Sequence, residues 1–203
     1  YNNLLHRTNI KLTRNKKVSN YLEINPTNFN NKEYYRVFND GSFELGGRFY
    51  GPWWLNLSKD IRNYIALDNK KTVELDYGSL NIHLLYSEED LNYYDLNESI
   101  ADPYVLKGVD KDERDINKLI ITIALNETKK SKFVYAVKKG IEDVNDNNSL
   151  FGNKKLLEVP NAKEIWRRIR LFEKENSLIK HHLFTGVGKR LQFKDSCIAE
   201  SII

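Results

Sequence analysis

The stretch Thr72-Val-Glu-Leu-Asp-Tyr-Gly-Ser-Leu-Asn-Ile-His-Leu-Leu-Tyr86 carries the most informative local pattern in the chain. It predicts an apolar strand over residues 72–77 and then a turn, after which a helix begins. The strand would deliver one carboxylate, Asp76, to that turn. Many phosphoryl-transfer enzymes hold a divalent metal on an acid in this position, but an Asp before a helix also suits a simple N-terminal cap.

The composition sets broad limits. The 203 residues are 40% hydrophobic, enough for one domain or one large lobe with an ordinary core. Lys and Arg total 32 against 28 Asp and Glu, and the net charge of +4 is compatible with a polyanionic partner without requiring one.

Cysteine and hydropathy narrow the class of protein further. The single cysteine, Cys197, excludes an internal disulfide and a cysteine-rich zinc site, which favours a reducing compartment. No apolar run approaches the roughly 20 residues that a membrane span needs, so we expect a cytoplasmic protein without a membrane partner. The absence of methionine, even at position 1, suggests a fragment or a processed product.

The first part of the chain predicts irregular structure followed by a hairpin. Residues 1–32 are rich in Asn, Lys and Thr and are expected to form an arm or short helices. Aromatic and β-branched residues flank Asp40-Gly41, which predicts a hairpin or a strand and loop between Tyr34 and Phe49. Ser58 suits the cap of a helix of about two turns that reaches Ile65.

Helical periodicity dominates downstream. Apolar spacing predicts a helix near 111–127 and a second one over 131–143, followed by a polar loop at 143–149. Another helix should begin at Pro160, and the last segment, 188–203, also has a helical pattern. The predicted fold class is α+β, with a small antiparallel sheet and several packed helices.

Two further groups of residues suit phosphate or nucleic-acid chemistry. In Gly46-Gly-Arg-Phe-Tyr-Gly-Pro-Trp-Trp54, Arg48 offers a phosphate-binding fork while Trp53 and Trp54 offer faces for bases, although the tryptophans equally suit a core. Arg114 and Lys118 are four residues apart on one helical face and could hold a triphosphate. They also suit a solvated basic edge paired with neighbouring acids.

In this order, the three groups resemble the palm and fingers of A-family DNA polymerases. Gly47-Arg48 corresponds to a substrate motif, Val73-Glu-Leu-Asp-Tyr-Gly-Ser-Leu80 to motif A, and Arg114-Asp-Ile-Asn-Lys118 to the start of motif B. The match is closer to polymerase-like proteins of phages and mobile elements, which carry a similar Gly-Gly-Arg-Phe-Tyr-Gly-x-Trp-Trp run. The resemblance covers a palm and fingers region at 33–203 and leaves an N-terminal arm, 1–32, unassigned.

The resemblance implies a palm-like sheet and magnesium-dependent addition of nucleotides to the 3′ end of a nucleic acid. Nucleoside triphosphates and a primer-template or single strand would be the partners. By position, Asp76 and the Tyr77 carbonyl would bind Mg²⁺, and Arg48 would contact the primer-template. The remaining implied roles are triphosphate binding by Arg114 and Lys118, sugar selection at Asn81, and nucleic-acid contacts by Trp53, Trp54 and Gln192.

The pattern departs from the family at motif C, whose second metal-binding carboxylate is missing. His181-His182 lacks an adjacent acid, and Asp195 is expected to be a solvated charge. Another chain or segment would then supply motif C. The alternatives are a structural subunit, or a catalytically inactive nucleic-acid-binding module using Arg48, the Trp53-Trp54 pair and a basic helix with Arg167, Arg168 and Arg170.

Overall fold

The computed structural model describes residues 2–96, 102–150 and 156–202. The chain divides into two compact units. Unit 1 comprises Tyr1–Gly78 and Asp195–Ile203, and unit 2 comprises Ser79–Lys194. The boundary at residue 33, between an N-terminal arm and a polymerase-like region, was drawn from the sequence resemblance and stays a prediction.

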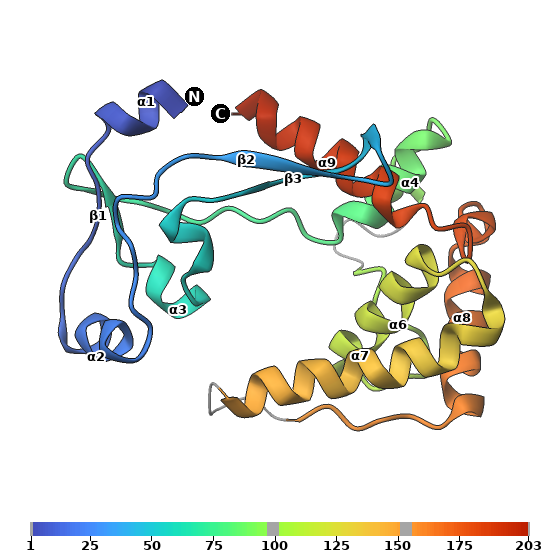
Figure 1. The fold of residues 1–203 in the computed structure, drawn as a ribbon. Helices are drawn as coiled ribbons and strands as arrows, with labels where there is room; N and C mark the ends of the chain where they lie inside the picture. Colours follow the sequence, from blue (N-terminus) through green and yellow to red (C-terminus); the bar gives the residue numbers. More distant parts are fainter. Residues whose placement is uncertain (1, 97–101, 151–155, 203) are drawn as a thin grey trace. The chain divides into compact units, whose positions relative to one another are not determined.

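Unit 1 begins with short elements that lead into a small sheet (Figure 1). The first elements in the chain are α1 (Asn2–Arg7), β1 (Ile10–Leu12) and α2 (Lys16–Ile24). Strand β1 pairs antiparallel with β4 (Ile65–Leu67), which pairs antiparallel with β5 (Lys70–Lys71). The expectation of short helices before residue 32 is therefore confirmed.

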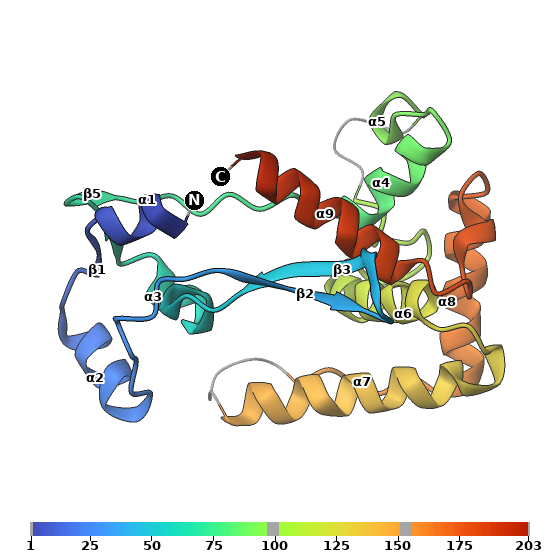
Figure 2. The ribbon, with the colours of Figure 1, turned by 45° about the horizontal axis from the view of Figure 1, so that its top comes forward.

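A separate antiparallel hairpin forms the second sheet of unit 1. It joins β2 (Tyr35–Asn39) to β3 (Ser42–Tyr50), which run side by side in Figure 2. Asp40 and Gly41 connect the strands with φ angles of 53° and 68°, as a tight two-residue hairpin turn requires. The Asp-Gly signal therefore predicted this hairpin correctly.

The core of unit 1 is built around Trp53. This side chain is only 2% exposed, and the ring of Phe29 packs edge-on against it with centroids 5.0 Å apart. Trp53 begins the short 3-10 helix η1 (Trp53–Asn56), and Ile61 of α3 (Lys59–Arg62) completes this part of the core. The helix expected after Ser58 exists, but it is one turn long because Ile65 belongs to β4.

Unit 2 is helical in its described residues. Its helices begin with α4 (Leu80–Glu88), α5 (Tyr93–Leu96) and α6 (Arg114–Asn126), the last after a 3-10 turn, η2 (Lys111–Glu113). They continue with α7 (Lys130–Leu150), α8 (Ala162–Glu175), the 3-10 turn η3 (Lys180–His182) and α9 (Gly188–Ile202). Helix α9 starts in unit 2 and ends in unit 1.

Helix α6 is the centre of unit 2 and packs against both α7 and α8 (Figure 1). Its buried face includes Ile120, Ile121 and Ala124, each fully enclosed. Gly140 of α7 lets the two helices approach, since a Cβ there would lie 3.0 Å from Ile123 Cδ1. The periodicity that predicted helices near 111–127, after Pro160 and over 188–203 is confirmed.

Two local predictions are wrong. The polar run 143–149 is part of α7, and the Asn145 amide binds the segment that follows the helix, donating to Leu157 O at 2.9 Å and accepting from Leu157 N at 2.8 Å. Residues 72–77 form no strand, although the pattern predicted one. Thr72 N and Oγ1 both bond to Ile65 O, and the ladder ends there.

The coarse fold class, α+β with small antiparallel sheets, is confirmed in the residues that the structure describes. Among those residues, no helix has the length and apolar character needed to cross a membrane.

Candidate functional site

Asp76 lies in an extended, exposed segment rather than at the end of a buried strand. Val73 is 80% exposed and Leu75 is 90% exposed, so the segment contributes nothing to the core of unit 1. Glu74 forms an ion pair with Arg62 at 3.1 Å. Asp76 and Tyr77 are both exposed, which leaves the Asp76 carboxylate accessible to a ligand.

Arg48 lies on β3, in the strand that packs against the end of α9. Gly47 has a φ of 75°, and a Cβ there would come within 3.0 Å of Ser196 Oγ and 2.9 Å of Arg36 Nη2. A side chain at this position would therefore separate β3 from α9. Arg48 is exposed on the strand next to this close contact.

Arg36 of β2 holds the end of α9 in place. Its Nε donates to Gly47 O at 2.8 Å, its Nη2 donates to Ser196 Oγ at 2.7 Å, and its Nη1 pairs with Glu200 Oε2 at 2.8 Å. One guanidinium thus joins both strands of the hairpin to two turns of α9. Asp195 precedes Ser196, so the same contacts fix its backbone.

Asp195 shares its surroundings with Arg48 and Asp76. Burial raises the pKa of the Asp195 carboxyl above its ordinary value, the positive charge of Arg48 lowers it, and the negative charge of Asp76 raises it again. Arg48 and Asp76, from two other stretches of sequence, are therefore close enough to influence the Asp195 carboxyl. All three belong to unit 1.

The expectation that Asp195 is a solvated charge is wrong, because the side chain is partly buried and its pKa responds to Asp76. No local pattern around Asp195 signals this position. The position of Asp195 arises from the fold, in which Arg36 binds the side chains of Ser196 and Glu200.

The arrangement suits a divalent cation and a phosphate. The raised pKa of Asp195 means that Arg48 does not fully offset burial and the nearby charge of Asp76. A divalent cation on both carboxylates would stabilise their ionised forms, and carboxylate oxygens are ligands that Mg²⁺ prefers. The exposed guanidinium of Arg48 can bind phosphate oxygens in pairs.

Of the predicted stacking residues, Trp53 is buried and offers no face to a base in this structure. Of the two roles considered for Trp53, packing in the core is therefore the correct one. Trp54 is half-buried, and its Nε1 donates to Tyr34 Oη at 3.0 Å. Its indole packs edge-on against Tyr34.

The other predicted site residues lie in unit 2. Arg114 Nε donates to Asp102 Oδ2 at 2.7 Å and its Nη1 pairs with Asp115 Oδ1 at 3.1 Å. Hydrogen bonding to Asp102 is the main reason that the pKa of Arg114 is raised. Lys118 is exposed on the same helix, while Asn81 on α4 and Gln192 on α9 are half-buried. Arg114 is therefore paired with acids, as the alternative interpretation expected.

The basic helix proposed for nucleic-acid binding is largely neutralised. Arg168 is only 4% exposed and contacts Glu113, Glu164 and the Asn117 amide oxygen, the last two at 3.0 Å. Arg167 pairs with Glu164 at 2.7 Å. Arg168 is therefore buried rather than available to a nucleic acid, whereas Arg170 is exposed.

Comparisons with models of protein families, with curated proteins and with solved structures found no match for this chain.

Proposed function

We propose that the chain is a magnesium-dependent nucleotidyltransferase that resembles A-family DNA polymerases and adds nucleotides to the 3′ end of a nucleic acid. The observation that carries the proposal is the exposed carboxylate of Asp76, which lies in the same unit as the exposed Arg48 and the partly buried Asp195 and influences the Asp195 carboxyl. Two of these residues belong to motifs that the sequence resemblance singles out. Asp195 adds the second carboxylate that two-metal phosphoryl-transfer sites need.

Each residue has a role in this proposal. Asp76 and Asp195 would hold Mg²⁺, with the Tyr77 carbonyl as a further oxygen ligand. When bound, Mg²⁺ neutralises charge on the attacking and leaving oxygens. Arg48 would bind a phosphate of the primer-template or of the reacting end. Lys118 and Arg114 would bind the triphosphate, and Arg114 would have to exchange an acidic partner for it.

A palm-like sheet is part of the proposal and needs a further strand. Val73, Leu75 and Tyr77 alternate with polar residues along the extended segment, and all three are exposed. This alternation suits a strand that pairs with a neighbour at its edge and packs its apolar face against another layer. A segment or chain that supplies motif C would provide such a partner.

The inactive-binding alternative has less support. Among its proposed contact residues, Trp53 is buried, and Arg167 and Arg168 are engaged with acidic side chains. A module that relied on these groups would have to break existing interactions before it could bind phosphate.

The test is a primer-extension assay with Mg²⁺ and either deoxyribo- or ribonucleoside triphosphates, beside a gel shift with the same primer-template. Asp76→Asn should reduce incorporation by at least about 100-fold, the effect expected when a stabiliser of transition-state charge is lost. Binding in the gel shift should persist. Asp60→Asn is the matched control, because Asp60 is an exposed carboxylate of unit 1 paired with Lys17.

Equal extension by the parent and Asp76→Asn would refute the catalytic assignment. A parent chain that binds primer-template but incorporates nothing would support the inactive module. If it also failed to bind, a structural subunit would remain.

A further inference from the structure

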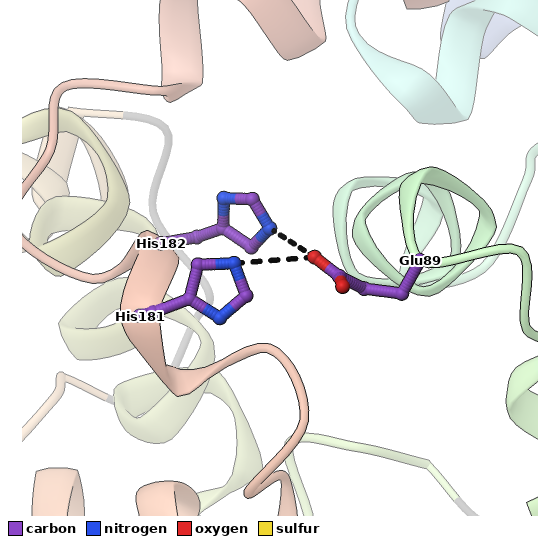
Figure 3. Close-up of side chains that lie close together, drawn as sticks. All are labelled: Glu89, His181 and His182. Atoms are coloured by element: carbon purple, nitrogen blue, oxygen red, sulfur yellow. Dashed lines mark hydrogen bonds and ion pairs between the residues drawn. The ribbon is translucent and has the colours of Figure 1, made fainter.

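Three potential metal ligands lie close together in unit 2, and none of them is a residue of the proposed active site. Glu89 follows the last residue of α4, and His181 and His182 belong to η3. Glu89 Oε1 lies 3.1 Å from His181 Nε2 and 3.2 Å from His182 Nε2. Figure 3 shows both imidazoles turned toward this one carboxylate.

The spacing of these atoms is that of a metal site. The three ligand atoms all lie within 4.8 Å of one another, and the two imidazole centroids are 4.0 Å apart. In a tetrahedral zinc site with bonds of about 2.0 to 2.1 Å, neighbouring ligand atoms are about 3.4 Å apart. The two measured nitrogen-to-oxygen distances are therefore close to the edges of such a tetrahedron.

The backbone fixes Glu89 firmly. Asp90 has a φ of 56°, Asp90 N donates to Ser87 O, and Leu91 N donates to Tyr86 O at 3.0 Å. This pair of bonds is a Schellman cap, which ends α4 in a defined geometry with Glu89 at the C-cap. The ligand is thus held on a rigid helix end.

The histidine side is fixed as well. Ile179 and Leu183, which flank η3, are both buried in the core of unit 2. Thr185 Oγ1 donates to His182 O at 2.7 Å. The two imidazoles therefore project from an anchored turn. They contact Glu89, which is 93 positions before His182 in the sequence.

The neighbouring cations pair with Glu88 rather than with Glu89. Arg190 Nη1 and Lys194 Nζ both bind Glu88 Oε1, at 2.5 and 2.7 Å. Burial alone would raise the pKa of Glu88, but these hydrogen bonds outweigh it and hold the pKa below its ordinary value. In the described part of the chain, the ion-pair partners of Glu89 are His181 and His182.

We propose that Glu89, His181 and His182 form a binding site for a divalent transition metal, with Zn²⁺ the best fit. Two imidazole nitrogens and one carboxylate oxygen suit zinc, whereas Mg²⁺ and Ca²⁺ prefer oxygen ligands alone. Glu89 and His181 are exposed, so water can occupy the fourth position. The metal would join the end of α4 to η3 and stabilise unit 2, since it binds the folded state.

The test is a competition titration of the full chain with Zn²⁺ and a chromophoric chelator, in the presence of a reducing agent. We expect one tight site, because imidazole nitrogens favour Zn²⁺ over carboxylates alone, and Co²⁺ in its place should give a visible tetrahedral absorption band. Glu89→Gln and His182→Ala should each weaken Zn²⁺ binding by about 100-fold or more, because loss of an outer partner alone costs 10- to 100-fold. Far-UV circular dichroism checks that each variant is folded.

His6→Ala is the matched control. His6 forms a comparable exposed pair with Glu33, at 3.0 Å, but within the described residues it belongs to no cluster of three potential metal ligands. This variant and Cys197→Ser should both keep the parent affinity for Zn²⁺.

Absence of Zn²⁺ binding in the parent would refute the site, as would unchanged affinity in Glu89→Gln and His182→Ala. Loss of binding in Asp76→Asn with retention in Glu89→Gln would assign the metal to the other unit. Because Zn²⁺ binding is read without nucleotide, failure of the proposed polymerase-like activity would leave this result intact.

Discussion

Arg36 Nη2 donates a hydrogen bond of 2.7 Å to the hydroxyl of Ser196, and this bond joins the β2–β3 hairpin to the end of α9. The same guanidinium binds Gly47 O and Glu200. Asp195 and Arg48 are the sequence neighbours of Ser196 and Gly47. Arg36 is therefore a positioning residue that holds the second carboxylate of the candidate site beside its arginine.

Replacing Arg36 should loosen this arrangement. Arg36→Gln is expected to lower the free energy of unfolding by about 1 to 3 kcal/mol, the range for hydrogen bonds to charged groups. Nucleotide addition should fall by more than the folded fraction does, because Asp195 loses its support. Urea denaturation and primer extension measure the two effects. Arg36→Lys should rescue only part of either, since an ammonium cannot reproduce the planar fork.

The control for Arg36 is Arg14→Gln, which removes an exposed arginine of the same unit. An unfolding midpoint for Arg36→Gln equal to that of the parent would contradict the positioning role.

Stability should depend on the ionisation of Asp195 in acid. The folded-state pKa of Asp195 is raised from 3.8, so the native chain holds this proton more tightly than the unfolded chain. Ionisation of Asp195 therefore lowers the free energy of unfolding as pH rises from the ordinary pKa to the raised one. Asp195→Asn should remove this contribution and make the chain more stable near neutral pH.

The measurement is the free energy of unfolding of the parent and of Asp195→Asn across the acidic range, without divalent metal. Mg²⁺ should reduce the difference in the free energy of unfolding between the two chains, because it stabilises the ionised Asp195 carboxylate. Parallel curves at every pH would show that Asp195 does not titrate differently in the folded state.

Arg168 should matter for stability rather than for nucleic-acid binding. Arg168→Met leaves the carboxylates of Glu113 and Glu164 and the buried Asn117 without their shared partner. The free energy of unfolding should fall by about 3 kcal/mol. This is the lower part of the range for a broken buried ion pair, since both carboxylates are partly exposed. Thermal denaturation measures it.

Arg170→Met, on the exposed face of the same helix, is the control and should change stability by less than about 0.5 kcal/mol. Weaker DNA binding by Arg168→Met with an unchanged unfolding midpoint would instead make Arg168 a nucleic-acid ligand.

Local signals predicted the elements that local interactions determine. The hairpin at 35–50 follows from Asp40-Gly41, because two positive φ angles are needed there. Helix α6 follows from its apolar spacing, which matches the buried face. These predictions needed no knowledge of the rest of the chain.

Long-range contacts decided the rest. The alternation in 72–77 predicted a strand, but no neighbouring strand pairs with it in the described residues. The Asn-rich run is helical, and Asn145 in it binds the Leu157 backbone, twelve residues away. Asp195 is partly buried next to Ser196, whose hydroxyl binds the guanidinium of Arg36, 160 positions away in the sequence. Sequence periodicity contains none of these pairings.

The most direct test of the candidate site is the affinity for Mn²⁺, a paramagnetic substitute for Mg²⁺, measured by electron paramagnetic resonance. The Glu89→Gln chain should serve as the background, so that the ligands in unit 2 do not contribute. Asp76→Asn and Asp195→Asn should each weaken Mn²⁺ binding by at least about tenfold, and the double variant should be little weaker than either, as expected for residues that share one ligand. Unchanged affinity in Asp195→Asn, or losses that simply add, would contradict a site formed by both carboxylates.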